Sequence, residues 1–149
     1  MRAVVQRVKS ARVSVDEQEI ARIDGGLLVY AGVAAEDSSE DSLYLAKKIV
    51  GLRIFNDEQG KFNLDVRQTG GKVMLVSNFT LHGDGRKGRR PSFVGTAGQE
   101  QARGLLSELA KQIRGQGIFV AEGQFAAHMQ IESVNDGPVN VLLDSSKVF

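Results

Sequence analysis

The sequence has no cysteine and no long apolar run. Without cysteine, disulfide bonds, thiolate nucleophiles and thiolate-bound zinc are excluded, and the composition suits a cytoplasmic protein. A membrane-spanning helix needs about 18 or more apolar residues in succession. The first residues, 1–8, carry charges where a signal peptide would have its apolar core. We therefore expect a cytoplasmic protein without disulfides and without a membrane span.

The sequence also has no large excess of positive or negative charge and no metal-binding motif. The chain has 19 basic and 18 acidic residues, so binding to a polyanion would rest on local clustering. His82 and His128 have no partners at metal-binding spacing, and no metal or other cofactor is predicted. With 149 residues the chain can bury most of its apolar surface unaided, so we predict one domain over residues 1–149.

The stretch 73–93 contains the most informative pattern. Its first residues are apolar β-formers, which predict a strand buried on both faces. This strand ends in small hydrogen-bonding side chains at Ser77, Asn78 and Thr80. A loop follows with four cations, Arg86, Lys87, Arg89 and Arg90. A polar group of residues beside a dense positive patch indicates a polyanionic substrate, although a solvated charge run has the same pattern.

The rest of the chain alternates between strand and helix patterns. Apolar stripes at helical spacing predict one helix from about residue 38 to 50 and a second over about 96–114. Residues 3–8 and 11–15 are predicted as one long bent strand or two short ones. Further strands are predicted at 20–23, 27–33, 52–55, 62–66, 73–76, 118–122, 129–134 and 139–143, with a turn at 135–138. Because turns join most of them, we predict an α+β fold with mainly antiparallel sheets covered by two helices.

Two apparent motifs, one for dinucleotide binding and one for a nucleophile, lack the neighbouring features that these functions require. The segment 83–88 spells G-x-G-x-x-G, but no helix opens on its last glycine, so a dinucleotide site is rejected. Ser77 and Thr80 could act as nucleophiles, but no G-x-S-x-G turn or neighbouring base accompanies them. Hydrogen bonding at the strand end is the favoured interpretation of both residues.

Longer motifs indicate a family. The segments 77–81, 86–93 and 135–139 closely resemble the D-aminoacyl-tRNA deacylases, and segments 1–8, 52–57 and 123–129 extend the similarity over the chain. The resemblance implies a homodimeric, barrel-like α+β protein with active sites at the subunit interface. It also implies hydrolysis of the ester between a D-amino acid and the 3′ end of tRNA, and of mischarged glycyl-tRNA.

The resemblance further assigns roles to residues. It implies a cis Gly137-Pro138 bond whose carbonyls reach the partner's site and leave no room for an L side chain. Arg7 would hold these carbonyls, and Phe125 and Met129 would lie near the adenosine or aminoacyl pocket. Ser77, Asn78, Phe79 and Thr80 would form the other wall. There Thr80 matches a proposed nucleophile, but the family is described as using the tRNA 2′-hydroxyl, with the Phe79 main-chain amide positioning the ester.

Two positions depart from the family pattern, and two rival functions stay open. Asn78 stands where the family usually has glutamine, and Asn140 where it usually has threonine. A non-catalytic RNA-binding module would use Lys87, Arg89 and Arg90 on phosphates and show steep salt dependence without turnover. A hydrolase using Thr80 as its nucleophile would lose activity on removal of that hydroxyl.

Overall fold

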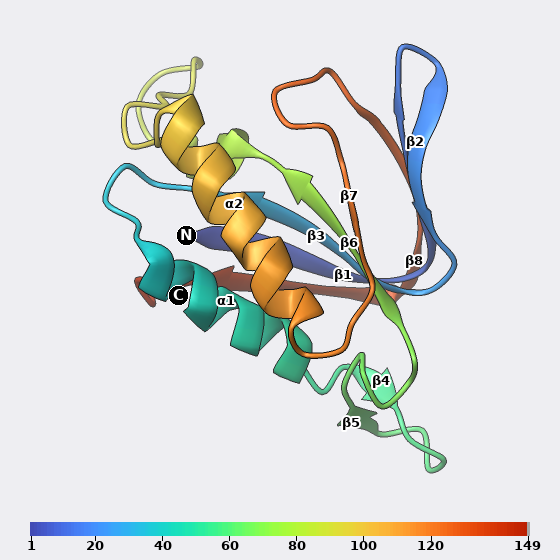
Figure 1. Cartoon of the computed structure of the whole chain (residues 1–149). Coiled ribbons are helices and arrows are strands. Elements are labelled where there is room, and N and C mark those ends of the chain that lie inside the picture. The colour runs from blue at the N-terminus through green and yellow to red at the C-terminus, as the bar shows by residue number, and fades with distance from the viewer. Residues whose placement is uncertain (149) are drawn as a thin grey trace.

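The computed structural model describes residues 1–148, which form one large sheet, one small sheet and two helices (Figure 1). Among the described residues, no helix has the length and apolar character that crossing a membrane requires. In chain order the elements are β1 (Arg2–Val15), β2 (Gln18–Ile23), β3 (Gly26–Gly32), α1 (Ser39–Gly51), β4 (Phe55–Asn56), β5 (Phe62–Leu64), β6 (Lys72–Ser77), the 3-10 turn η1 (Phe79–His82), α2 (Gln99–Arg114), β7 (Val120–Glu122) and β8 (Gln130–Asp144).

The large sheet is built around β1. This strand pairs antiparallel with β2, β3 and β8, whereas β3 pairs parallel with β6 and β6 pairs parallel with β7. The mainly antiparallel α+β fold is confirmed, and the two parallel pairs add a feature that turn patterns do not predict. They arise because the connections that contain α1 and α2 cross over between parallel strands, which a short turn cannot do.

The two helices lie side by side across one face of the large sheet (Figure 1). Their apolar stripes are fully buried there, through Leu45 and Ile49 of α1 and Leu109 and Ile113 of α2. These side chains pack against the sheet in the main core cluster. A second, smaller cluster lies around Met74 of β6. Both helices therefore form for the predicted reason, which is burial of one apolar face.

The segment predicted as strand, turn and strand near the C-terminus is one strand. β8 pairs with β1 up to Asn135 and again from Asn140, and the register shifts opposite Arg7. The predicted turn is therefore wrong, and the segment is a bulge. Its physical reason is the length of β1, whose 14 residues provide a ladder for both halves of β8.

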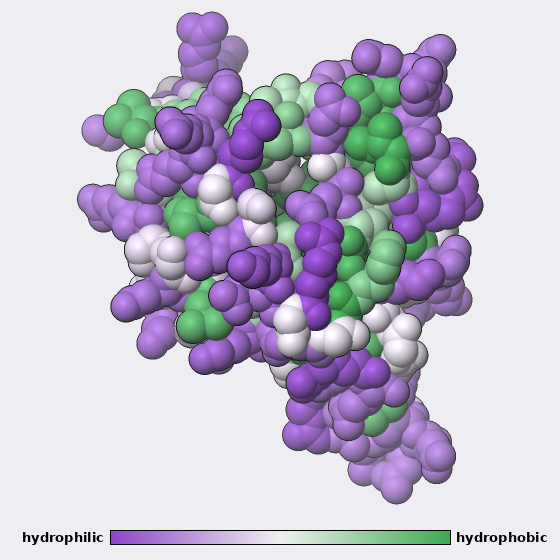
Figure 2. Space-filling model, viewed as in Figure 1, coloured by the Kyte–Doolittle hydropathy of each residue, from purple (hydrophilic) through white to green (hydrophobic). Residues whose placement is uncertain are grey.

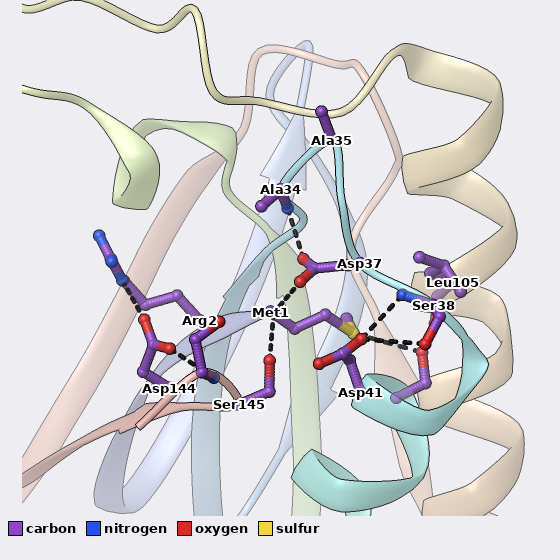
Figure 3. Close-up of polar contacts among 12 residues, drawn as sticks. Met1, Arg2, Ala34, Ala35, Asp37, Ser38, Asp41, Leu105, Asp144 and Ser145 are labelled. Carbon is purple, nitrogen blue, oxygen red and sulfur yellow. Dashed lines mark hydrogen bonds and ion pairs between the residues drawn. The ribbon is translucent and has the colours of Figure 1, made fainter. Parts of the chain in front are cut away.

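Polar contacts join the start of β1, the end of β8 and the start of α1 (Figure 3). The Met1 ammonium group donates to the Asp37 carboxylate and to the Ser145 hydroxyl. Arg2 pairs with Asp144, with 2.9 Å between Nε and Oδ2. Asp37 also accepts from the main-chain N–H of Ala34. These contacts hold the connection from β3 to α1, which borders the cavity described next.

Candidate active site

A cavity of about 470 Å³ lies beyond the carboxyl ends of β3 and β6. These strands are parallel neighbours, and the pairing of Ala31 with Ser77 brings their ends level. Figure 2 shows the hollow between α2 and the segment that joins β7 to β8. Its lining residues are Ala31, Gly32, Val33, Ser77, Asn78, Phe79, Thr96, Ala97, Gln99, Ala102, Leu106, Phe125, Ala126, Ala127 and Met129.

Asn78 shapes the wall at the end of β6. Its main-chain N–H donates to the carbonyl of Ala31 at 2.8 Å, which fixes the strand end. Its side-chain oxygen accepts from the N–H of Thr80 at 3.1 Å and also from the Thr80 hydroxyl. An asparagine side chain can cap a turn in this way because it reaches the main chain two residues on. The Thr80 hydroxyl therefore donates to an amide oxygen, which is not a base that could activate it.

The main-chain N–H of Phe79 is an unpaired donor on this wall. Phe79 is the first residue of η1, where a helical N–H has no partner within its own turn. Within residues 1–148, no acceptor is bonded to it. Phe79 is 58% exposed, and its ring packs edge-on against that of Phe93 with 5.2 Å between centroids. A fixed, unpaired N–H beside a cavity can stabilise a developing negative charge.

The opposite wall comes from the segment after β7 and from α2. Phe125 and Met129 line the cavity, and the Arg103 guanidinium lies 4.9 Å from the centroid of the Phe125 ring. The α2 contribution was missed in the sequence, although the basic loop leads directly into this helix. The helix begins at Gln99 with Gly98 as the N-cap, and the Thr96 hydroxyl before it donates to the Phe93 carbonyl at 2.8 Å.

The bulge in β8 lies outside this cavity. Gly137 and Pro138 do not line this cavity among the described residues, and the peptide bond between them is cis. Arg7, which is 8% exposed, donates from Nε to the carbonyl of Asp136 at 3.2 Å and pairs with the Asp136 carboxylate at 3.1 Å. The second anchor of Arg7 is the carbonyl of Ile54, 2.6 Å from a terminal nitrogen. Arg7 thus braces the residue that precedes Gly137.

The comparisons with known proteins identify the family. A family model described as D-Tyr-tRNA(Tyr) deacylase matches residues 4–144. The chain belongs to this deacylase family. It is 54% identical to the D-aminoacyl-tRNA deacylase of Clostridioides difficile and 53% identical to that of Caldicellulosiruptor saccharolyticus, in both cases over 149 residues and the full length of both chains. The members so named are hydrolases of an ester bond.

Solved structures agree with the deacylase fold. A structure titled c-Myc DNA Unwinding Element Binding Protein is 36% identical, has a TM-score of 0.91 and covers 97% of this chain and 98% of its own. A structure of a probable eukaryotic D-amino acid tRNA deacylase has a TM-score of 0.81 and covers 95% of this chain and 97% of its own. At 14% identity, the second shows the fold alone.

The two departures from the deacylase pattern have different surroundings. Asn78 has a structural role, as the cap of η1. Within residues 1–148, the side chain of Asn140 makes only a long contact of 3.5 Å from Nδ2 to the side chain of Asn135. It is Asn135 that braces the bulge, because its Nδ2 donates to the carbonyl of Arg7 at 3.0 Å. The Asn140 side chain therefore contributes little to fixing the position of the Gly137-Pro138 segment.

The basic loop of this deacylase contains two kinds of cation. Arg86 is bound to Asp84 at 2.9 Å and 2.7 Å, and this pairing holds the pKa of the Asp84 carboxyl far below its usual range. No ion-pair partner lies near the three other cations within the described chain, which are Lys87, Arg89 and Arg90. One arginine of the loop is therefore neutralised by an ion pair, and the three other cations are available to bind phosphate.

Residues 1–148 contain no group of three or more histidine, aspartate or glutamate side chains that could hold a metal ion. The polar atoms at the cavity are hydroxyl, amide and main-chain groups. What the site offers is therefore hydrogen bonding and shape.

Proposed function

We propose that this protein hydrolyses the ester that joins a D-amino acid to the 3′ end of tRNA, and releases the free amino acid and the tRNA. The observation that carries the proposal is the unpaired N–H of Phe79 on the wall of a cavity, in a chain of the deacylase family. The ester carbonyl oxygen would accept from this N–H. As water adds to the carbonyl, negative charge grows on that oxygen, and one such donor is typically worth about 10²–10³ in rate.

The substrate supplies what the protein lacks. No side chain within the described part of the cavity wall pairs a base with a nucleophile, and the Thr80 hydroxyl is engaged with Asn78. The 2′-hydroxyl of the terminal adenosine lies next to the ester and would position the attacking water. The bond between the acyl carbon and the ribose 3′-oxygen then breaks, and that oxygen takes the proton that the attacking water gives up and leaves as a hydroxyl. Oriented groups suffice here because an activated ester needs less assistance than an amide.

Chiral selection would come from a second copy of the chain. Gly137 and Pro138 are exposed, so their carbonyls can face a partner's cavity, and Arg7 holds the residue before them. A Cβ on Gly137 would lie 2.7 Å from the Val139 side chain, so this position favours glycine. We infer a homodimer in which these carbonyls accept from the substrate amino group and block an L side chain. Glycine has no side chain to block, so glycyl-tRNA is also a substrate.

Single-turnover hydrolysis tests this function. D-tyrosyl-tRNA, L-tyrosyl-tRNA and glycyl-tRNA are mixed separately with excess protein, and loss of the ester is followed in time. We expect rapid cleavage of the D and glycyl esters and none of the L ester. Equal, slow cleavage of the D and L esters would contradict the proposal. Tight tRNA binding with no cleavage would favour the RNA-binding module instead.

A further inference from the structure

A second cavity of about 210 Å³ lies next to the first. Three residues line both, namely Ser77, Leu106 and Phe125. Its own wall adds Arg103 and Ser107 of α2 and Glu122 of β7. The volume is below the roughly 300–1,000 Å³ of pockets that enclose drug-sized ligands, so this space suits a small group.

Arg103 is the unbalanced charge at this second cavity. Within residues 1–148 it makes no ion pair, and its guanidinium lies over the Phe125 ring at 4.9 Å. The one carboxylate on the same wall, Glu122, is bound by Arg114 at 2.6 Å. Ser107 follows Arg103 by one helical turn and therefore shares its face of α2. A guanidinium and a hydroxyl on one face are donors that suit a phosphate.

Because Phe125 lines both cavities, its position indicates which phosphate of the tRNA would reach Arg103. Under the proposed function, the terminal adenosine and its amino acid occupy the first cavity. The next group along the RNA is the phosphodiester on the 5′ side of that adenosine. Arg103 lies against Phe125 at the second cavity, so an RNA chain that leaves the first cavity past Phe125 would meet it.

We propose that Arg103 binds the phosphodiester 5′ to the terminal nucleotide of the substrate, with the second cavity as its subsite. The inference rests on the proposed function and extends it, because it makes affinity depend on a phosphate rather than on the amino acid. It is independent of the basic loop at residues 84–90, whose cations lie on a different segment.

Two small substrates isolate this contact. 3′-O-D-tyrosyl adenosine and its 5′-monophosphate differ by the phosphate alone. We expect wild type to have about a tenfold lower KM for the phosphorylated compound, the size of one charge-assisted hydrogen-bonded contact. In Arg103→Gln the ratio of the two KM values should fall to near one, and Arg103→Lys should retain part of it. With tRNA as the ligand, Arg103→Gln should lower the slope of log affinity against log salt by about one.

Lys111→Gln is the matched control, since it removes one cation from the same helix about 12 Å further along its axis. It should keep the tenfold ratio. A wild-type ratio near one, or an Arg103→Gln ratio equal to that of wild type, would overturn the inference. Equal losses on both compounds would assign Arg103 to packing against Phe125 and also overturn it. If wild type bound both compounds without cleaving them, the proposed function would fail, whereas the ratio of Kd values would still test Arg103.

Discussion

The wall at the end of β6 and the basic loop follow one another in the chain, yet the fold holds them very differently. Asn78 is fixed by its bond to Ala31 and by its cap on Thr80, so the Phe79 N–H has a set direction. The basic loop is tied at its base, where Asp84 and Ser92 exchange main-chain hydrogen bonds of 2.8 Å and 2.9 Å. Beyond that bridge its cations are exposed.

This difference separates rate from affinity. Stabilising a transition state needs a donor at a fixed place, because the gain falls away when the geometry is loose. Attraction of a polyanion needs only charge nearby, since phosphates are spread along the RNA. We therefore expect changes in the wall to alter the rate of the chemical step, and changes in the loop to alter affinity.

Removing the Phe79 N–H should have the largest effect. Phe79→Pro deletes the donor, and the first position of a helical turn accepts proline. Single-turnover cleavage of D-tyrosyl-tRNA should slow by about 10²–10³, the usual value of one such donor. Phe79→Ala is the control, because it removes the ring and keeps the N–H. If alanine slowed the reaction as much as proline, the Phe79 ring would be the group that promotes catalysis, and the role given to the main-chain N–H would be wrong.

Gly137→Ala should have the next largest effect. Gly137 has a φ of +133°, and an added Cβ would lie 2.9 Å from the main-chain nitrogen of Val139. Strain at such a position is about 1–3 kcal/mol, so the backbone should shift and cleavage of the D ester should fall by about 10- to 100-fold. The measurement is the single-turnover rate on D- and L-tyrosyl-tRNA. An unchanged rate would show that the segment plays no part in the site.

Mixed dimers sharpen that test. Coexpressed Phe79→Pro and Gly137→Ala chains would form dimers in which one site carries both changes and the other neither. About a quarter of wild-type activity should return if the site is shared across a two-fold interface. No recovery in a preparation shown by mass to contain mixed dimers would place both groups in the same subunit's site.

Charge changes in the loop should act on affinity alone. Reversal of charge at Lys87 and Arg89 should weaken tRNA binding by more than about tenfold and lower the salt slope by up to about two. The D to L ratio of cleavage rates should stay as in wild type. Arg86→Gln should weaken binding less than Arg89→Gln, because Arg86 is already paired with Asp84. A loss of chiral preference in the reversed variant would break the proposed division between wall and loop.

The parts that could be predicted from the sequence are those with a local cause. The α2 stripe specifies a buried face, and Leu109 and Ile113 lie on it. The parallel pairs of β6 were not predicted, because they depend on crossovers between strands far apart in the chain. For the same reason, the sequence did not predict that α2 lines the cavity or that β8 continues through Gly137. The pairing of Arg86 with Asp84 also needed coordinates, because a charged sequence run does not show which cations are neutralised.

Thr80→Val should have the smallest effect, and it tests the wall most directly. The variant keeps the branched shape and the main-chain N–H that Asn78 accepts, and it loses only the hydroxyl that donates to the same oxygen. If the wall acts through its main chain, single-turnover cleavage of D-tyrosyl-tRNA should change by less than about threefold, in line with the loss of one hydrogen bond at an exposed site. A nucleophilic hydroxyl would instead make the reaction collapse, as triad residues do when removed. That collapse would assign catalysis to Thr80 and return Phe79 to a supporting role.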